Sequence, residues 1–298
     1  MNILFLGGNR FFGKKLLKKI SNKKKDKIFI INRGHRKIER DVLKKLNVKL
    51  IKCDRKDEAK LGRKLKNLKF DLIFDNCAYH LNDIKILINI IYKNCNPTYI
   101  FSSTVMSYLN IYLKKKRLNE NDWYRAKSTK NMLKIYKSQE LKYARNKRKI
   151  ENFFIKNRKI KYIILRIHNV VGKFDFSKKT FKLFNTNFDQ LKNYNFNEED
   201  LLQFTYDEDL VKILYKFFNK KQAHSDVYNI CNDPIKVKYF LKKKDKFFKN
   251  KIINIDDKKF PFPKNVIMAN HKIKKKLNFK FTPINKIIYR ISKSSEFK

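Results

Sequence analysis

Short apolar runs alternate with longer amphipathic segments along the first half of the chain. The runs rich in β-branched and aromatic residues are Ile3–Leu6, Lys27–Ile31, Val48–Ile51, Leu72–Phe74, Thr98–Phe101 and Ile160–Leu165. The segments between them have the length and polarity of helices, and the longest is a Lys-rich helix predicted over residues 136–156. Strands separated in this way predict right-handed crossovers, and hence an α/β fold with a doubly wound parallel sheet.

Glycine is rare and is concentrated behind the first predicted strand. Three of the six glycines lie between Ile3–Leu6 and a helix-like segment. Glycine at this point allows a tight turn and brings the backbone close to a pyrophosphate at the helix N-terminus. The pattern predicts a Rossmann-type sheet whose first loop binds a dinucleotide through Gly7, Gly8, Asn9, Arg10, Phe11, Phe12 and Gly13. An ordinary tight turn is the alternative, because Arg10 occupies the middle place of the Gly-x-x-Gly-x-x-Gly fingerprint.

The strand–helix alternation weakens beyond residue 172. Aromatic, Lys- and Asn-rich stretches follow, with a helix predicted over residues 207–218 and a strand at Asp226–Ile230. We therefore predict an NAD(P)-binding domain over residues 1–172. A smaller substrate-capping region, partly interleaved with that domain, is predicted over residues 173–298.

The formal net charge of +47 raises the question of a nucleic-acid partner. However, Lys, Asn, Ile, Phe and Tyr are all abundant and all have A/T-rich codons, so a biased genome explains this composition. The basic residues are also spread along the whole chain. Nucleic-acid binding is an alternative that we do not favour, although such a field attracts polyanions at low salt.

The cysteines argue against a disulfide framework and a zinc site, and they indicate a reducing compartment. Cys53, Cys77, Cys95 and Cys231 show no Cys-x-x-Cys spacing and no paired histidines. We expect free thiols, no metal site and a cytoplasmic location. No apolar run reaches the length of a membrane span, and the first strand is cut short by glycine, unlike a signal peptide.

Ligands of such sheets bind at the carboxyl ends of the strands, so the residues just after each strand matter most. After the second strand come Asn32, Arg33 and Gly34, and after the third come Asp54 and Arg55. The fourth strand leads into Asp75-Asn76-Cys77-Ala78-Tyr79, and the fifth into Ser102-Ser103-Thr104.

With these motifs, the chain resembles the extended short-chain dehydrogenase/reductase superfamily. It looks like the NAD(P)-dependent epimerase/dehydratase group whose first loop reads Gly-Gly-Thr-Arg-Phe-x-Gly. The landmarks are Gly7–Gly13, Asn32–Gly34, Phe70–Tyr79, Tyr99–Ser103, Tyr143–Lys147, Leu165–Gly172, Gln203–Leu210, Val227–Ile230 and Leu277–Pro283. The resemblance implies that Asp54 faces the adenine, that Asn76 and Ala78 line the adenosine side, and that Asn169 lies near the substrate.

The superfamily signature Tyr-x-x-x-Lys starts at Tyr112, Tyr143, Tyr239 and Tyr289, about as often as this composition predicts by chance. Tyr143 and Lys147 are distinguished by following Ser103 by some forty residues and preceding the next strand. A spacing of four places both side chains on one side of a helix. A solvated Lys-rich helix is the alternative.

The resemblance gives each of these residues a role. Lys147 would hold the nicotinamide ribose and lower the pKa of the Tyr143 phenol from near 10. Tyr143 would then exchange a proton with the substrate while the nicotinamide exchanges a hydride. Ser103 would donate a hydrogen bond to the same substrate oxygen, and Thr104 would do so if the register is shifted by one residue.

The segment after the second strand indicates the cofactor. An NAD enzyme usually has Asp or Glu there, whereas this chain has Asn32 and Arg33, with Arg36, Lys37 and Arg10 nearby. Several cations could pair with a 2′-phosphate, so NADP(H) is favoured over NAD(H).

A small-molecule substrate, a sugar or nucleotide-sugar, is expected from the resemblance. Dehydratases of the superfamily carry Asp-Glu after the active-site Thr, whereas Thr104 and Val105 follow Ser103 here. This difference disfavours dehydratase chemistry, so we expect an epimerase or a reductase. Two alternatives stay open: an RNA-binding protein resembling chloroplast stem-loop-binding proteins, and a redox sensor that binds NADP without turnover. By analogy, the helix of Tyr143 would contribute to a homodimer.

Overall fold

The computed structural model describes residues 1–8, 10–34, 38, 40–45, 47–108, 117–125, 138–219, 224–248 and 260–297. The chain divides into two compact units. One is formed by Met1–Leu109, Lys127–Arg166 and Val211–Tyr228, and the other by Asn110–Ala126, Ile167–Leu210 and Asn229–Lys298. Each unit thus combines three segments of sequence. The predicted boundary at residue 172 stays a prediction.

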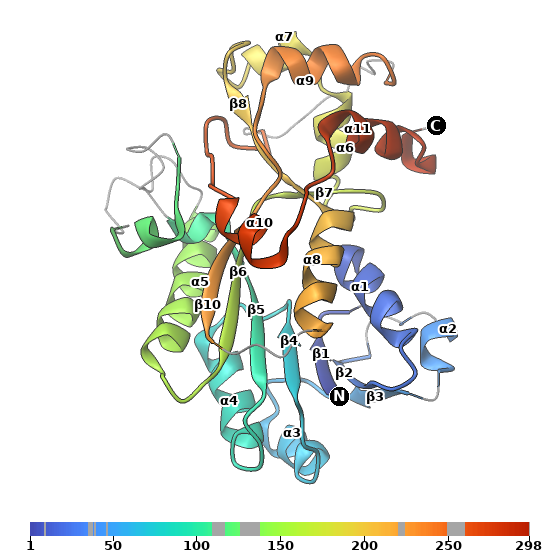
Figure 1. Cartoon of the computed structure of the whole chain (residues 1–298), viewed down its shortest axis with the longest axis vertical. Helices are drawn as coiled ribbons and strands as arrows, with labels where there is room; N and C mark the ends of the chain where they lie inside the picture. Colours follow the sequence, from blue (N-terminus) through green and yellow to red (C-terminus); the bar gives the residue numbers. More distant parts are fainter. Residues whose placement is uncertain are drawn as a thin grey trace. The chain divides into compact units, whose positions relative to one another are not determined.

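A seven-stranded sheet with the order β10-β6-β5-β4-β1-β2-β3 forms the centre of the fold (Figure 1). The strands are β1 (Asn2–Leu6), β2 (Lys27–Asn32), β3 (Val48–Lys52), β4 (Leu72–Asp75), β5 (Thr98–Thr104), β6 (Tyr162–Ile167) and β10 (Asp226–Ile230). The neighbouring pairs from β5 to β3 are parallel, with Leu4 in register with Phe29 of β2 and Ile73 of β4. The order reverses beside β1, which confirms a doubly wound, Rossmann-type α/β fold.

Helices cover both faces of this sheet. They are α1 (Phe11–Ser21), α2 (Arg40–Leu43), α3 (Glu58–Leu65), α4 (Leu81–Ile91), α5 (Ser138–Lys156) and α8 (Asp207–Asn219). Successive side chains of a strand point to opposite faces. Accordingly, Leu4 joins one core cluster with residues of α3, α4 and α5, whereas the Phe5 ring lies 6.5 Å from Phe218 of α8.

The second unit has its own aromatic core. It contains two small sheets, formed by β7 (Val170–Val171) with β9 (Thr205–Tyr206) and by β8 (Leu201–Leu202) with β11 (Ile235–Lys236). Its helices are α6 (Lys179–Asn185), α7 (Phe188–Lys192), α9 (Val237–Lys244), α10 (His271–Leu277) and α11 (Ile284–Ser292). Phe184 packs against Phe240 and Phe248, with ring centroids 5.5 and 5.1 Å away. Aromatic packing thus stabilises this unit.

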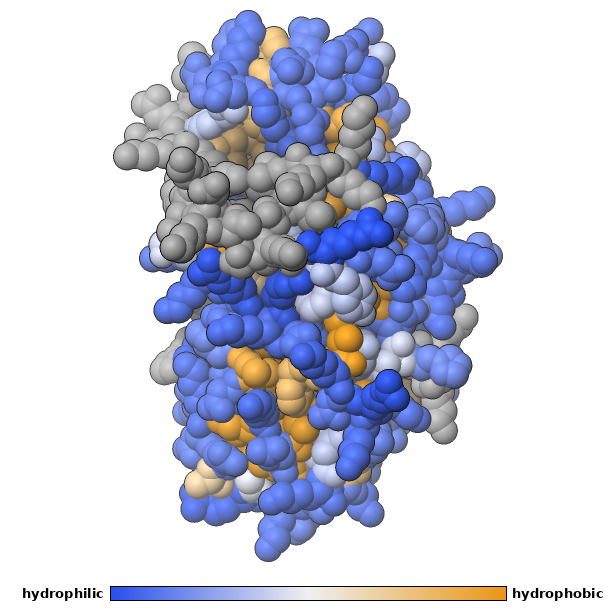
Figure 2. All heavy atoms as spheres, turned by 90° about the vertical axis from the view of Figure 1, so that its left-hand side faces the viewer, coloured by the Kyte–Doolittle hydropathy of each residue, from blue (hydrophilic) through white to orange (hydrophobic). Residues whose placement is uncertain are grey.

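One face of the molecule is mostly hydrophilic where the structure describes it. Figure 2 shows hydrophilic residues over much of this face, with several hydrophobic patches between them. This agrees with the even spread of Lys and Arg along the chain. Among the helices that the structure describes, none combines the length and the apolar character needed to cross a bilayer.

Candidate active site

The turn between β1 and α1 requires glycine for geometric reasons. Gly7 has a φ of +92°, and a Cβ added there would lie 3.0 Å from the Cβ of Asn76. A Cβ at Gly13 would lie only 2.4 Å from the carbonyl oxygen of Gly7. Arg10 is the N-cap residue of α1, and its side chain does not cap the helix. The turn therefore forms a cradle that side chains would fill, next to helix N–H groups that can bind an anion. This arrangement fits a dinucleotide pyrophosphate.

The structure also describes Phe11 and Phe12, which we predicted to bind the dinucleotide in this loop. Phe11 and Phe12 begin α1, and their ring centroids lie 6.1 Å apart. Phe11 has a φ of +45°, a left-handed conformation that a bulky residue seldom adopts. Asn9 lies outside the described residues.

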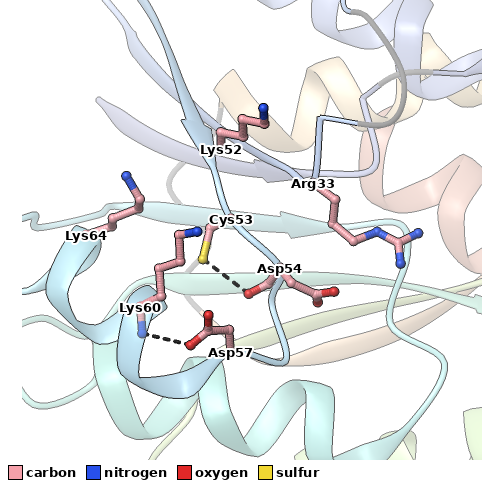
Figure 3. Close-up of a pocket in the computed structure, with 7 residues that line it drawn as sticks. All are labelled: Arg33, Lys52, Cys53, Asp54, Asp57, Lys60 and Lys64. Atoms are coloured by element: carbon pink, nitrogen blue, oxygen red, sulfur yellow. Dashed lines mark hydrogen bonds between the residues drawn. The ribbon is translucent and has the colours of Figure 1, made fainter.

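A pocket of about 500 Å³ lies at the carboxyl ends of β2 and β3 (Figure 3). Its lining comprises Arg33, Lys52, Cys53, Asp54, Asp57, Lys60 and Lys64. The Asn32 side chain accepts a hydrogen bond from the Gly34 N–H at 3.0 Å, which fixes the turn that presents Arg33. Four cationic side chains outnumber two carboxylates here. Arg36 and Lys37 lie outside the described residues.

Arg55, which we also expect among the cofactor contacts, forms a buried ion pair, and that expected contact stays a prediction. Its guanidinium donates two hydrogen bonds to Asp75, at 3.0 and 2.7 Å, and Tyr99 donates a third at 2.6 Å. Burial alone would raise the pKa of Asp75, but Arg55 holds that pKa below its usual value. The Arg55 side chain is only 11% exposed and faces Asp75.

The segment after β4 contacts the glycine turn. The Asn76 N–H donates to the Leu6 carbonyl oxygen at 3.1 Å, and the Asn76 side chain lies against Gly7. Ala78 is fully buried two residues later. Asn76 and Ala78, which we predicted to line the adenosine side, therefore come directly after β4, the strand that pairs with β1.

Tyr143 and Lys147 lie on α5, where Lys147 is buried with 3% of its surface exposed. The Lys147 Nζ donates to the carbonyl oxygen of Ser102 at 2.8 Å and lies 5.7 Å from the Tyr143 ring centroid. Burial lowers the pKa of Lys147 to about 8. The structure thus brings the two signature residues together at the end of β5.

The pKa of Tyr143 differs from the sequence-based expectation. Burial raises it, the neighbouring Tyr79 adds to the rise, and a hydrogen bond with Thr104 lowers it in part. The pKa of Tyr143 is thus shifted upward overall, opposite to the expected direction. Desolvation of the phenolate outweighs the other influences, because a buried anion loses its hydration.

Ser103 and Thr104 have different neighbours in the structure. The Ser103 hydroxyl donates to Glu151, which accepts a second hydrogen bond from Arg166 Nε at 2.9 Å. Glu151 and Arg166 are both fully buried, so Ser103 belongs to an internal network. Thr104 instead lies close enough to the Tyr143 hydroxyl to lower the pKa of that phenol in part. Neighbouring residues of a strand point to opposite faces, so Ser103 and Thr104 have different surroundings, and which of them would contact a substrate stays a prediction.

Asn169 belongs to the second unit. Its side-chain amide donates to the carbonyl oxygen of Pro261 at 2.7 Å, and its backbone N–H donates to His168 Nδ1 at 2.8 Å. The predicted contact of Asn169 with the substrate stays a prediction.

Sequence reasoning did not single out Tyr79. Its ring centroid lies 5.9 Å from that of Tyr143 and 5.3 Å from the Lys147 Nζ. Tyr79 ends the segment after β4, so its position at a strand end was the available signal.

Comparisons with known proteins address the fold. No family model matches the sequence, and no curated protein matches it either. Solved structures do match. The dTDP-glucose 4,6-dehydratase of Bacillus anthracis str. Ames, in complex with NAD, is 16% identical, with 100% of this chain and 98% of that one covered at a TM-score of 0.68.

Two epimerases give similar values. A UDP-glucose 4-epimerase is 16% identical and matches at a TM-score of 0.71, with 98% of this chain and 96% of that chain covered. The UDP-glucose 4-epimerase of Thermotoga maritima, with UDP-glucose, is 16% identical, with coverages of 98% and 97% and a TM-score of 0.66. The chain has the fold of these enzymes. The similarity extends over the whole chain, including both compact units.

Proposed function

We propose that the chain is an NAD(P)-dependent epimerase or reductase of the extended short-chain dehydrogenase/reductase superfamily. Its substrate would be a sugar or nucleotide-sugar. The observation that carries the proposal is the position of Lys147, whose buried Nζ donates to the Ser102 carbonyl oxygen at 2.8 Å and lies 5.7 Å from the Tyr143 ring centroid. Thr104 ends the same strand as Ser102 and lies near the Tyr143 hydroxyl. These three residues thus lie beside the carboxyl end of β5, and ligands of such sheets bind at strand ends of this kind.

Each of the three residues has a distinct task in this reaction. With its raised pKa, Tyr143 carries its proton at neutral pH and can donate it to a substrate carbonyl oxygen. Thr104 would hold the same oxygen by a hydrogen bond, and Lys147 would bind ribose hydroxyls and favour transfer of the proton. The nicotinamide, when bound, would supply the hydride that reduces the carbonyl carbon, and it would accept a hydride in the reverse direction.

The glycine turn and the pocket in Figure 3 support a dinucleotide cofactor. The turn would cradle the pyrophosphate. Arg33, Lys52, Lys60 and Lys64 line the pocket at the ends of β2 and β3, where a ribose 2′-phosphate would find cationic partners. We therefore propose NADP(H) as the preferred cofactor.

The residues after Thr104 argue against dehydration. Val105 and Met106 follow it, so the two positions that carry acids in the dehydratases are apolar here. Elimination of water needs a group that removes a carbon-bound proton, and these side chains cannot do so. We do not propose the RNA-binding alternative, because an RNA-binding surface has no need of a phenol paired with a buried lysine. Homodimer formation stays a prediction.

Turnover of UDP- and dTDP-sugars by point variants, with NADP(H) or NAD(H), tests this proposal. We expect Tyr143→Phe to lower kcat by roughly 10²- to 10⁴-fold and Thr104→Val by about 10²-fold, with cofactor affinity unchanged. Ser103→Ala is the matched control and should lower kcat by less than about tenfold, since Ser103 faces Glu151. Full activity of Tyr143→Phe, or a larger loss in Ser103→Ala than in Thr104→Val, would contradict the assignment.

A further inference from the structure

Three aromatic rings surround the buried ammonium of Lys147. The Nζ atom lies 4.7 Å from the ring centroid of Phe101, 5.3 Å from that of Tyr79 and 5.7 Å from that of Tyr143. All three distances fall within the range in which a ring attracts a cation. The rings come from β5, from the segment after β4 and from α5, so the tertiary fold assembles the cluster.

The ammonium has few polar partners for a buried charge. Its Nζ donates to the Ser102 carbonyl oxygen at 2.8 Å, and in the described part of the chain no carboxylate forms an ion pair with it. A buried cation is costly unless its surroundings replace the lost hydration. Aromatic faces carry negative potential and can supply part of that replacement.

Charged and titratable groups lie near Lys147 on several of the described elements. Asp75 on β4, Cys77 after β4 and Glu151 on α5 favour its charged form, whereas Arg55 after β3 opposes it. The carboxyl of Asp75 is already bound to Arg55, and that of Glu151 to Arg166. Both carboxyls are thus paired with other cations, whereas the three rings face Lys147 directly.

Tyr79 differs from the other two rings in being accessible. It is 53% exposed, whereas Phe101 is fully buried and Tyr143 is the proposed acid. Its side chain can therefore be replaced without opening the core or removing a reacting group.

We propose that Tyr79 is a positioning residue, whose aromatic face completes a three-ring cage that keeps Lys147 charged and directed toward the candidate active site. The catalytic part of this statement rests on the proposed function. The cage itself is a property of the folded chain and can be tested without ligand or turnover.

The test measures how readily Lys147 is acetylated as a function of pH. Acetic anhydride labels only the neutral amine, so the midpoint for the Lys147 peptide, read by mass spectrometry, reports its protonation. We expect Tyr79→Phe, which keeps the ring, to leave the midpoint unchanged. Tyr79→Leu, which keeps apolar cover without an aromatic face, should lower it by about half to one pH unit.

The matched control removes another exposed ring that faces a lysine. Tyr239 is 49% exposed and lies 5.2 Å from the Nζ of Lys238, so Tyr239→Leu should leave the Lys147 midpoint unchanged. An unchanged or raised midpoint in Tyr79→Leu would overturn the cage. An equal fall in Tyr79→Phe would overturn it too, because the hydroxyl and not the ring would then be responsible.

The pH profile of kcat/KM tests the catalytic part. Its alkaline limb should move to lower pH in Tyr79→Leu by the same amount as the labelling midpoint. A shift in labelling without a shift in the profile would contradict the positioning role. If the wild-type chain turns over no sugar, the proposed function fails, and the labelling result still decides on the cage.

Discussion

Lys147 donates to a backbone carbonyl and not to a carboxylate, and its surroundings are aromatic and largely dry. Burial lowers the pKa of Lys147 from 10.5 to about 8, so its charge is held at a cost in folding free energy.

This cost predicts a stability gain with a defined pH dependence. Between pH 8 and 10.5 the unfolded chain binds the Lys147 proton more tightly than the folded chain does, so this group makes stability rise with pH there. Below pH 8 Lys147 is protonated in the folded and the unfolded chain, so the full cost of burying its charge is present. Lys147→Met should therefore be more stable than wild type at pH 7 by about 1–3 kcal/mol, with a smaller gain near pH 10.

Urea unfolding of both proteins at these two pH values checks the prediction. A Lys147→Met variant that is less stable than wild type at pH 7 would mean that the lysine contributes net stability. The same variant should have no turnover.

At the scale of secondary structure, the sequence pattern predicted all seven strands of the central sheet. Short apolar runs bounded by turn residues are typical of the buried strands of a parallel sheet, so the strand positions could be predicted from the sequence. The end of β5 was harder to predict. The strand runs on to Thr104 through Ser102 and Ser103, and polar residues in a strand give no signal of which face they point to.

The sequence therefore could not show that Ser103 faces Glu151 whereas Thr104 lies near Tyr143. The ion pair of Arg55 was unpredictable for a related reason. Its partner Asp75 lies at the end of β4, and no sequence spacing reveals such a tertiary ion pair. The ring of Tyr79 likewise reaches Lys147 only through the tertiary fold.

The glycine turn supports a sharp prediction at this scale. Gly13→Ala would bring a methyl group within 2.4 Å of the Gly7 carbonyl oxygen, so the turn must open and the helix N-terminus must move. We expect at least a tenfold loss of dinucleotide affinity, measured by titration calorimetry.

Gly62 provides the matched control, because a Cβ there meets nothing within 4 Å. It lies within helix α3, so Gly62→Ala should bind normally and be more stable by about 0.5–1 kcal/mol. Equal affinity in both variants would contradict a pyrophosphate site at the turn.

At the scale of the whole molecule, the fold is shared with the epimerases and the dehydratase, whereas the charge of +47 is unusual. The charge gives the chain a general attraction for polyanions, and any nucleotide would be drawn to it at low salt. Binding through the turn and the pocket of Figure 3 is different, because it depends on fixed hydrogen-bond donors. Salt therefore separates the two kinds of binding.

The most direct measurement is a titration with NADPH and NADH, followed by nicotinamide fluorescence at about 0.15 M and 0.5 M salt. We predict saturable binding with one site per chain, NADPH tighter than NADH, and affinity that largely survives the higher salt. Binding that disappears at the higher salt, or no binding of either nucleotide, would contradict the proposed nicotinamide-dependent enzyme.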